Sequence, residues 1–458
     1  MRQQILINED WEFRRKGEAG TWLKVSLPHS AVEADADGAG HWQGLCEYRR
    51  SLVGQQVAKG ARQVLWIGGA MHTAVIFVDG REWGRHAGGY MSFEVDLTEA
   101  LADGQAHELS LELDNRDNPD LPPGKPFKEL DFCWYGGLYR GAELRVYPSL
   151  HISDELSAGM VGGGGVFFRT LEASEDSARC SVRIEIVNTN GNEAAACVSS
   201  VLLRDGVAVA TANSLTSVAC GGGRTHVEQK LSWAKPALWS VAQPKLHELQ
   251  VTILSSGGKV MDQRLLQVGV RRISFSRSSG FVLNGRRVRL RGTNRHQEYP
   301  IAGYAVGEAA DRRDARRIKE AGFDYVRLSH YPQSPAFLQA CDELGIVVMN
   351  AIPGWQYIGG EVFKDACETM AREVVRRDRN HACVVLWELS LNETQMDSDF
   401  IARMQRVGHE EYPGDQMFTC GRLDHYDVFF HTRQHGEIHH WQNRDKALVV
   451  AEYGDWEF

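Results

Sequence analysis

The hydrophobic pattern of the chain changes period after about residue 270, and this change limits the possible fold more than any other feature. Beyond that point, short apolar runs alternate with stretches of helical period at 307–322, 334–345 and 361–377. Strands that alternate with helices are typical of parallel βαβ units. Strands are predicted at 288–293, 324–329, 346–352, 384–391, 417–420, 427–432 and 447–453. A closed (β/α)8 barrel has eight strands, so we expect residues 271–458 to form a TIM barrel that lacks strand 8.

The first 270 residues have the pattern of two all-β domains. In 1–149, strand-like runs are separated by turn signals, and Asp79-Gly80 between two apolar runs predicts a hairpin. We therefore expect a jelly-roll sandwich over 1–149. In 150–270, alternating runs such as VRIEIV, VSSVLL and HELQVTIL are joined by glycine-rich loops. A length of about 120 residues with this pattern suits an immunoglobulin-like β-sandwich.

Composition excludes several classes of function. The net charge is −9, whereas a nucleic-acid-binding domain would need a basic face. The nine cysteines have no metal-ligand spacing, and no apolar run has the roughly 20 residues of a membrane span. No signal peptide is visible, so the chain is expected to be cytoplasmic, or periplasmic or secreted with its signal removed. The expected partner is a glycoside or oligosaccharide, with a homo-oligomer possible.

Polar side chains follow the predicted barrel strands at the point where each strand ends. Because the active sites of parallel barrels lie at the carboxyl ends of the strands, we expect these side chains to share one rim. Taken singly, a histidine there is more often structural, and an Asn-Glu pair is more often a helix cap or a loop. The joint pattern is what indicates a site. Its members are His296, Arg327, His330, Asn392, Glu393, His431, Glu452 and Tyr453.

Two of these residues, Glu393 and Glu452, are carboxylates on strands that should lie across the barrel from each other. A pair of carboxyl groups about 5–5.5 Å apart is what retaining glycoside hydrolysis requires. Asn392, next to the predicted acid, is suited to hydrogen-bond a sugar 2-hydroxyl. By contrast, Asp311 and Asp314 are predicted to lie on a solvated helix face.

The chain resembles glycoside hydrolase family 2, the β-galactosidase and β-glucuronidase family, over essentially its whole length. The stretches that carry the resemblance are VDGREWGRHAGGYMSFEVDLT, DFCWYGGLYR, RGTNRHQEYP, DYVRLSHYPQSPAFLQACDELGIVVMN, VVLWELSLNE and VVAEYG. The family implies a sugar-binding jelly roll, an immunoglobulin-like domain and a catalytic barrel, and compared with it we expect this chain to be truncated within the barrel.

The resemblance also implies a role for each matching residue. Glu393 corresponds to the general acid/base, and Glu452 corresponds to the nucleophile. His296 and His330 match the histidines that line the pocket of the terminal sugar, with Arg327 beside them. Asp131 resembles a first-domain aspartate that hydrogen-bonds sugar hydroxyls, or else it only opens a strand.

One segment departs from the family pattern. Bacterial β-galactosidases carry a DEANxExHG-like segment after strand 3, whose glutamate and histidine hold a magnesium ion. Here the segment reads NAIPGWQYIGG, so we predict no catalytic metal and no other cofactor. Trp355 in this segment is expected to stack on a sugar or to pack the loop.

These observations predict an exo-acting, retaining β-galactosidase. The pattern GTNRHQEYP is closer to the galactosidase form than to the glucuronidase form of the motif. A β-glucuronidase, another specificity of the family, or an inactive or carbohydrate-binding fragment are the alternatives. We also expect a raised pKa for Glu393, an ionised Glu452, and weak activity if strand 8 is missing.

Overall fold

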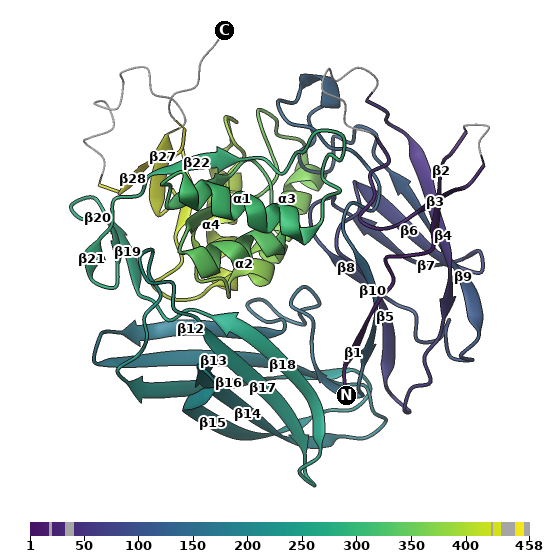
Figure 1. The fold of residues 1–458 in the computed structure, drawn as a ribbon, viewed down its shortest axis with the longest axis horizontal. Helices are drawn as coiled ribbons and strands as arrows, with labels where there is room; N and C mark the ends of the chain where they lie inside the picture. Colours follow the sequence, from purple (N-terminus) through teal and green to yellow (C-terminus); the bar gives the residue numbers. More distant parts are fainter. Residues whose placement is uncertain (18–20, 33–40, 423–424, 432–444, 453–458) are drawn as a thin grey trace.

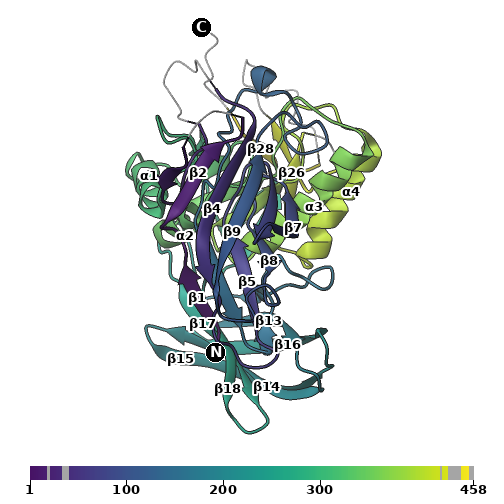
Figure 2. The same ribbon diagram turned by 90° about the vertical axis from the view of Figure 1, so that its right-hand side faces the viewer.

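The computed structural model describes residues 1–17, 21–32, 41–422, 425–431 and 445–452. Figure 1 shows three lobes that follow one another along the chain. The first sandwich, in purple and blue, lies beside the barrel lobe, in green and yellow, and the second sandwich, in teal, lies below both. Figure 2 shows the same order from the side of the first sandwich. In the described ranges, no helix is long and apolar enough to span a membrane.

The first sandwich consists of two antiparallel sheets with one core between them. One sheet has the order β1-β10-β5-β8, and the other has the order β3-β2-β4-β9-β6-β7. Buried side chains from both sheets, including Leu65 and Leu111, form the core. Asp79 and Gly80 have positive φ and join β6 to β7, which confirms the predicted hairpin. The strands are β1 Gln3–Leu6, β2 Trp11–Arg15, β3 Leu23–Val25, β4 Leu45–Val53, β5 Arg62–Ile67, β6 Thr73–Val78, β7 Arg81–Ala87, β8 Phe93–Asp96, β9 Ala106–Asp114 and β10 Ala142–Tyr147, with a 3-10 turn at Phe127–Glu129.

The second sandwich has the same layered construction with longer strands. β13 pairs with β11, β12 and β16, and the opposite sheet has the order β15-β14-β17-β18. Alternating apolar residues such as Ile184 and Val198 fill the space between the sheets. The strands are β11 Leu150–Ile152, β12 Val166–Ala173, β13 Ser177–Asn188, β14 Ala194–Arg204, β15 Val207–Val218, β16 Gly223–Ala234, β17 His247–Ser255 and β18 Val260–Val268.

The third lobe is a parallel sheet of seven strands in the order of the sequence, from β22 to β28, and it forms an incomplete (β/α)8 barrel. A small sheet of β19 Ile273–Ser276, β20 Gly280–Leu283 and β21 Arg286–Arg287 precedes it. The barrel elements are β22 Gly292–Arg295, α1 Glu308–Glu320, β23 Tyr325–Leu328, α2 Pro335–Leu344, β24 Val347–Ala351, α3 Glu361–Asp378, β25 Val384–Glu388, α4 Ser398–Glu411, β26 Thr419–Gly421, β27 Val428–His431 and β28 Leu448–Val450.

Several strand boundaries differ from the prediction, and two of them have a clear physical reason. The first barrel strand begins at Gly292 instead of 288, because Val288 and Leu290 pack on the core without joining the sheet. β25 ends at Glu388 instead of 391, because the buried Leu389 and Leu391 belong to the turn that follows. In both places the alternation of apolar residues reflects packing rather than strand pairing.

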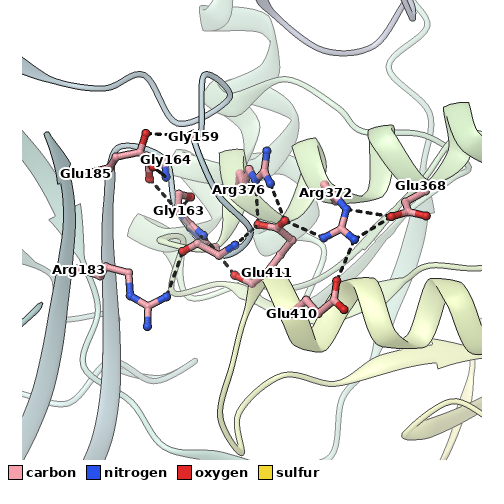
Figure 3. A network of polar contacts seen from close by, with 12 residues as sticks. Gly159, Gly163, Gly164, Arg183, Glu185, Glu368, Arg372, Arg376, Glu410 and Glu411 are labelled. Atoms are coloured by element: carbon pink, nitrogen blue, oxygen red, sulfur yellow. Dashed lines mark hydrogen bonds and ion pairs between the residues drawn. The ribbon is translucent and has the colours of Figure 1, made fainter. Parts of the chain in front are cut away.

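The second sandwich packs against the amino-terminal face of the barrel. Asn380, just before β25, accepts a hydrogen bond from the backbone N of Phe168 at 2.9 Å and donates to the carbonyl of Val166 at 2.7 Å. Arg379, at the end of α3, donates to the carbonyls of Gly163 and Gly164 at 2.6 and 2.8 Å. Figure 3 shows Gly163 and Gly164 of the second sandwich beside the ion pairs of Arg372 and Arg376 with Glu411. The opposite face of the barrel remains for the site.

An aromatic cluster joins the first sandwich to that opposite face. It contains Tyr90, Phe132 and Trp134 from the first sandwich, and Tyr304 and Tyr331 from the barrel. The rings of Tyr90 and Tyr331 stack with centroids 5.1 Å apart. The first sandwich therefore closes one side of the barrel rim through a rigid aromatic contact.

Candidate active site

The carboxyl ends of the barrel strands place the predicted residues on one rim. His296 directly follows β22, and His330 lies two residues beyond β23. Asn392 and Glu393 lie in the turn after β25, and Glu452 lies two residues after β28. All of these strands are parallel neighbours in one sheet, so their ends open toward the same side.

A fully buried guanidinium connects three of the groups at this rim. Arg327 on β23 donates to both carboxyl oxygens of Glu388, with N–O distances of 2.8 and 2.7 Å. Its Nη2 also donates to Asn392 Oδ1 at 3.1 Å, and its Nη1 donates to Glu452. Burial alone would lower the pKa of Arg327, but the charges of Glu388 and Glu452 raise it above its ordinary value. The cation is therefore permanent and fixes the position of Glu452.

Glu452 lies half-buried between Arg327 and the histidines. Its Oε1 is 3.9 Å from His330 Nε2. Burial raises the pKa of Glu452, the charges of Glu388 and Glu393 add to this rise, and the ion pair with Arg327 opposes it. Arg327 is the group that favours the charged form of Glu452, which we expect to stay ionised.

Glu393 has an unusual backbone and two hydrogen-bond donors on one oxygen. Its φ is 50°, a value that side-chain-bearing residues rarely adopt. Trp355 Nε1 donates to Glu393 Oε2 at 3.1 Å, and Gln356 Nε2 donates to the same atom at 3.0 Å. Backbone hydrogen bonds connect the two loops, from Gln356 N to Asn392 O at 2.9 Å and from Asn392 N to Gly354 O at 3.2 Å.

His296 and His330 are neutral at physiological pH. Burial lowers the pKa of His296 to about 4, and it lowers the pKa of His330 well below its ordinary value, with the charge of Arg327 adding to both shifts. His330 Nε2 lies 3.3 Å from Asn392 Nδ2. The two imidazoles have centroids 5.7 Å apart, and the ring of Phe132 lies beside both, with centroids 6.1 and 6.3 Å away. Neutral imidazoles can accept or donate hydrogen bonds to sugar hydroxyls.

Asp131 reaches the site from the first sandwich. It is exposed at the edge of the rim, yet the surrounding protein and the charges of Glu393 and Glu452 raise its pKa to about 6. The next residues of this loop contact the barrel through the backbone N of Cys133, which donates to Glu298 Oε1 at 3.1 Å. Three carboxyl groups therefore influence one another in one site.

The remaining predicted residues are placed as follows. His431 is the last residue of β27 and pairs in register with Val450 of β28, so it lies on the same rim. Trp355, which we expect to stack on a sugar or to pack the loop, donates its N–H to Glu393, and Lys125 Nζ lies 3.8 Å from its ring centroid. Tyr453 lies outside the described residues.

Sequence reasoning missed several residues of the site and misread two others. Glu388, which pairs with Arg327, had a signal, since it is a carboxylate inside the apolar strand VVLWE. Gln356 and Lys125 had no such signal in the sequence. The expected solvated face of Asp311 and Asp314 is wrong, because both carboxylates bind the buried Arg295 at 2.8 and 2.9 Å. A buried cation needs such partners.

The surroundings of Glu393 do not fit the magnesium ion that the family resemblance implies. Its Oε2 receives N–H groups from Trp355 and Gln356, and an N–H donor cannot ligate a cation. Elsewhere among the described residues, Asp342, His381 and Cys383 lie close enough to hold a metal. There, His381 Nδ1 already binds Asp342 Oδ2 at 2.6 Å, and burial raises the pKa of the Cys383 thiol well above its ordinary value. We assign that group a structural role.

Two β-sandwiches in front of a parallel barrel, with glutamates at the carboxyl ends of its strands, define a class of multidomain barrel protein with an acidic site at one rim. Two family models match the chain and identify the family within this class. The model of the glycosyl hydrolases family 2 matches residues 165–271, and the model of the TIM barrel domain of the same family matches residues 276–413. The chain belongs to glycoside hydrolase family 2.

Individual relatives point to the same family. A β-galactosidase of Thermoanaerobacter pseudethanolicus is 31% identical over 79% of this chain and 47% of its own length. A β-galactosidase of Thermoanaerobacterium thermosulfurigenes is 30% identical over 91% of this chain and 58% of its own. A Bacteroides uniformis β-glucuronidase structure has a TM-score of 0.87 at 26% identity, covering 99% of this chain and 59% of that one. The chain thus spans about half the length of the curated relatives it matches.

Proposed function

We propose that this chain carries the catalytic machinery of a retaining exo-β-glycosidase, which removes terminal β-linked sugars by double displacement. The observation that supports this most is the position of the two glutamates on one rim, where Glu393 follows β25, Glu452 follows β28, and Arg327 holds Glu452. The charge of Glu393 adds to the rise in the pKa of Glu452, and both charges act on Asp131. Retention requires the two carboxyl groups to lie about 5–5.5 Å apart. A separation of about 5–6 Å stays a prediction.

In the proposed first step, a carboxylate oxygen of Glu452 attacks the anomeric carbon. The bond from that carbon to the leaving oxygen breaks, and the leaving oxygen takes the proton of Glu393. In the second step, Glu393 takes a proton from water, the water oxygen bonds to the anomeric carbon, and the bond to Glu452 breaks. Arg327 holds Glu452 and, through Nη2, holds Asn392 toward the site.

The proposed substrate is a β-galactoside. Around the expected sugar pocket, Asp131 and Glu452 are acidic and His296 and His330 are neutral. The cation described above at this rim, Arg327, is already paired with Glu388 and Glu452. Such a lining suits a sugar without charge, because a uronate would meet like charges. The relatives at 31% and 30% identity are named β-galactosidases.

A β-glucuronidase is the second candidate. Relatives with that name are 28% and 27% identical to the chain, and Arg422 directly follows β26 on the same rim. A guanidinium there is the group that a uronate carboxylate would require. Arg422→Gln therefore separates the two candidates, because it should change the hydrolysis of glucuronides only.

The test is a panel of p-nitrophenyl β-glycosides, with Glu452→Gln as the control for contaminating activity. We expect hydrolysis of the galactoside, its loss in Glu452→Gln, and the β-anomer as the first product in a proton NMR time course. The α-anomer as first product would exclude retention. Hydrolysis of the glucuronide alone, lost in Arg422→Gln, would favour the second candidate.

A further inference from the structure

The side chain of Gln356 connects Glu393 to the first sandwich. Its Nε2 donates to Glu393 Oε2 at 3.0 Å, while its Oε1 accepts from Lys125 Nζ at 3.3 Å. An ammonium group can only donate hydrogen bonds. Lys125 therefore determines which end of the Gln356 amide faces Glu393, because the oxygen must turn toward the lysine and the nitrogen toward the carboxyl group.

Lys125 acts on Trp355 in the same way. Its Nζ lies 3.8 Å from the centroid of the Trp355 ring, well within the range of a cation–π contact. The indole N–H of that ring donates to the same Oε2 of Glu393 at 3.1 Å. One lysine from the first sandwich thus holds both members of the Trp355–Gln356 donor pair.

The backbone shows that this arrangement is specific. Gln356 and Glu393 have φ values of 48° and 50°, and such values in residues with side chains persist only where the surroundings fix them. The hydrogen bond from Gln356 N to Asn392 O, at 2.9 Å, connects the two loops. The first sandwich adds a second connection, in which the Tyr357 hydroxyl donates to the carbonyl of Pro119 at 3.1 Å.

We propose that Lys125, through the Trp355–Gln356 donor pair, positions the acid/base carboxyl group and makes Glu393 Oε1 the oxygen that carries the transferred proton. An oxygen that already receives two N–H hydrogen bonds is a poor place for a proton, because the proton would face both donors. The proton therefore lies on Oε1, passes from it to the leaving oxygen, and returns to it from water in the second step. This inference rests on the proposed function. Lys125 is a positioning residue, and it lies in a different domain from the group it orients.

The experiment compares two substrates of the same sugar in the full chain. A phenyl glycoside needs protonation of its leaving oxygen, whereas a 2,4-dinitrophenyl glycoside leaves without it. Lys125→Met keeps the length of the side chain without its charge, and Lys125→Arg keeps the charge and the donor. Lys128→Met is the matched control, because Lys128 is exposed three residues further along the same loop.

We expect Lys125→Met to lower kcat/KM about tenfold on the phenyl glycoside and less than twofold on the dinitrophenyl glycoside, since a misplaced acid loses part of its 10²–10⁴-fold effect. Lys125→Arg should recover most of the loss, and Lys128→Met should match the parent chain. An equal loss on both substrates would make Lys125 merely structural and overturn the proposal, as would no loss at all.

A second measurement does not depend on activity. The indole N–H signal of Trp355, assigned with Trp355→Phe in ¹⁵N-tryptophan-labelled protein, should move with pH and stop moving in Glu393→Gln. Lys125→Met should reduce that movement, and Lys128→Met should not. If the chain cleaves no glycoside, the proposed function fails and this signal alone decides the positioning role. An indole signal that ignores both Glu393 and Lys125 would overturn it.

Discussion

At the scale of single residues, Asp131 offers the clearest link between charge and function. Its pKa is raised to about 6 by the surrounding protein and by Glu393 and Glu452. Its charge therefore changes within the working range of an enzyme. The raised pKa means that the folded state binds the proton more tightly than the unfolded state, so the stability from this group falls as pH rises from about 4 to about 6.

We expect this titration to be visible in substrate binding. We propose that the Asp131 carboxylate accepts hydrogen bonds from sugar hydroxyls, and KM of the parent chain should then rise as pH falls from about 7.5 to about 5. Asp131→Asn should raise KM about tenfold at pH 7.5, the usual scale for a hydrogen bond to a charged group, and should flatten the pH dependence. Steady-state kinetics at both pH values check this. The same pH dependence of KM in both proteins would contradict it.

The sequence could predict individual site residues only where strand order placed them. His296, Arg327, Asn392 and Glu452 follow or end apolar strands, and the parallel sheet brings strand ends together whatever the loops do. Lys125 gave no signal, because its contacts lie 231 residues away along the chain. A contact across domains depends on how two lobes dock, and no local pattern records that.

At the scale of elements, local signals explain which boundaries were predictable. The helix at 335–344 starts after Ser334, whose hydroxyl accepts from Ala336 N, and is followed by Gly345. Both ends were expected because caps are local chemistry. The start of β22 and the end of β25 were not expected, because apolar residues that pack on the core also lie before β22 and after β25.

The segment between β24 and α3 leads to a prediction about metals. Trp355 and Gln356 supply N–H donors to Glu393, where a cation would need oxygen or nitrogen lone pairs. We expect dialysis against EDTA to leave kcat/KM within twofold of the untreated protein, with no gain from added magnesium. A tenfold loss that magnesium restores would show that a cation binds next to the acid after all.

The glycine-rich loop of the second sandwich allows a matched comparison. Gly164 has φ +87°, and a Cβ there would lie 2.2 Å from the carbonyl oxygen of Glu155. Gly206 has φ +78°, but a Cβ there would meet nothing within 4 Å. Both substitutions to alanine bear the cost of a positive φ, about 1–2 kcal/mol, and only Gly164→Ala adds a clash with backbone.

Gly164→Ala should therefore lower the free energy of unfolding by clearly more than Gly206→Ala, about 3 kcal/mol against about 1 kcal/mol. Urea denaturation followed by tryptophan fluorescence measures both. Equal losses would mean that the loop moves away from Glu155 without cost and does not fix the contact with the barrel.

At the scale of the whole molecule, the two interfaces of the barrel have different chemistry. The interface with the first sandwich borders the site and is largely aromatic. The interface with the second sandwich lies on the opposite face and combines buried polar contacts with apolar packing of Phe167 and Trp239 on the barrel core. There the buried Glu411 accepts from Arg372 and Arg376 and also from the backbone N of Gly162 at 3.1 Å (Figure 3). We therefore expect changes in the polar contacts between the barrel and the second sandwich to affect stability rather than the chemical steps.

Arg379 provides the test of that separation. Its guanidinium is buried, its pKa is lowered by burial to about 10, and it donates to the carbonyls of Gly163 and Gly164. Arg379→Met keeps much of the volume but leaves these carbonyls without their donor, at about 1–3 kcal/mol each. Calorimetry should show a transition lowered by about 6 °C or more, with kcat/KM at 25 °C within threefold of the parent chain.

Arg183→Met is the control, because Arg183 is partly exposed and contacts the neighbouring Gly162 carbonyl at 3.3 Å. This change should therefore lower the free energy of unfolding by less than about 1 kcal/mol. Equal thermal shifts in the two variants would show that the buried guanidinium does not join the domains, and a large loss of kcat/KM in Arg379→Met would show that the two faces of the barrel are coupled.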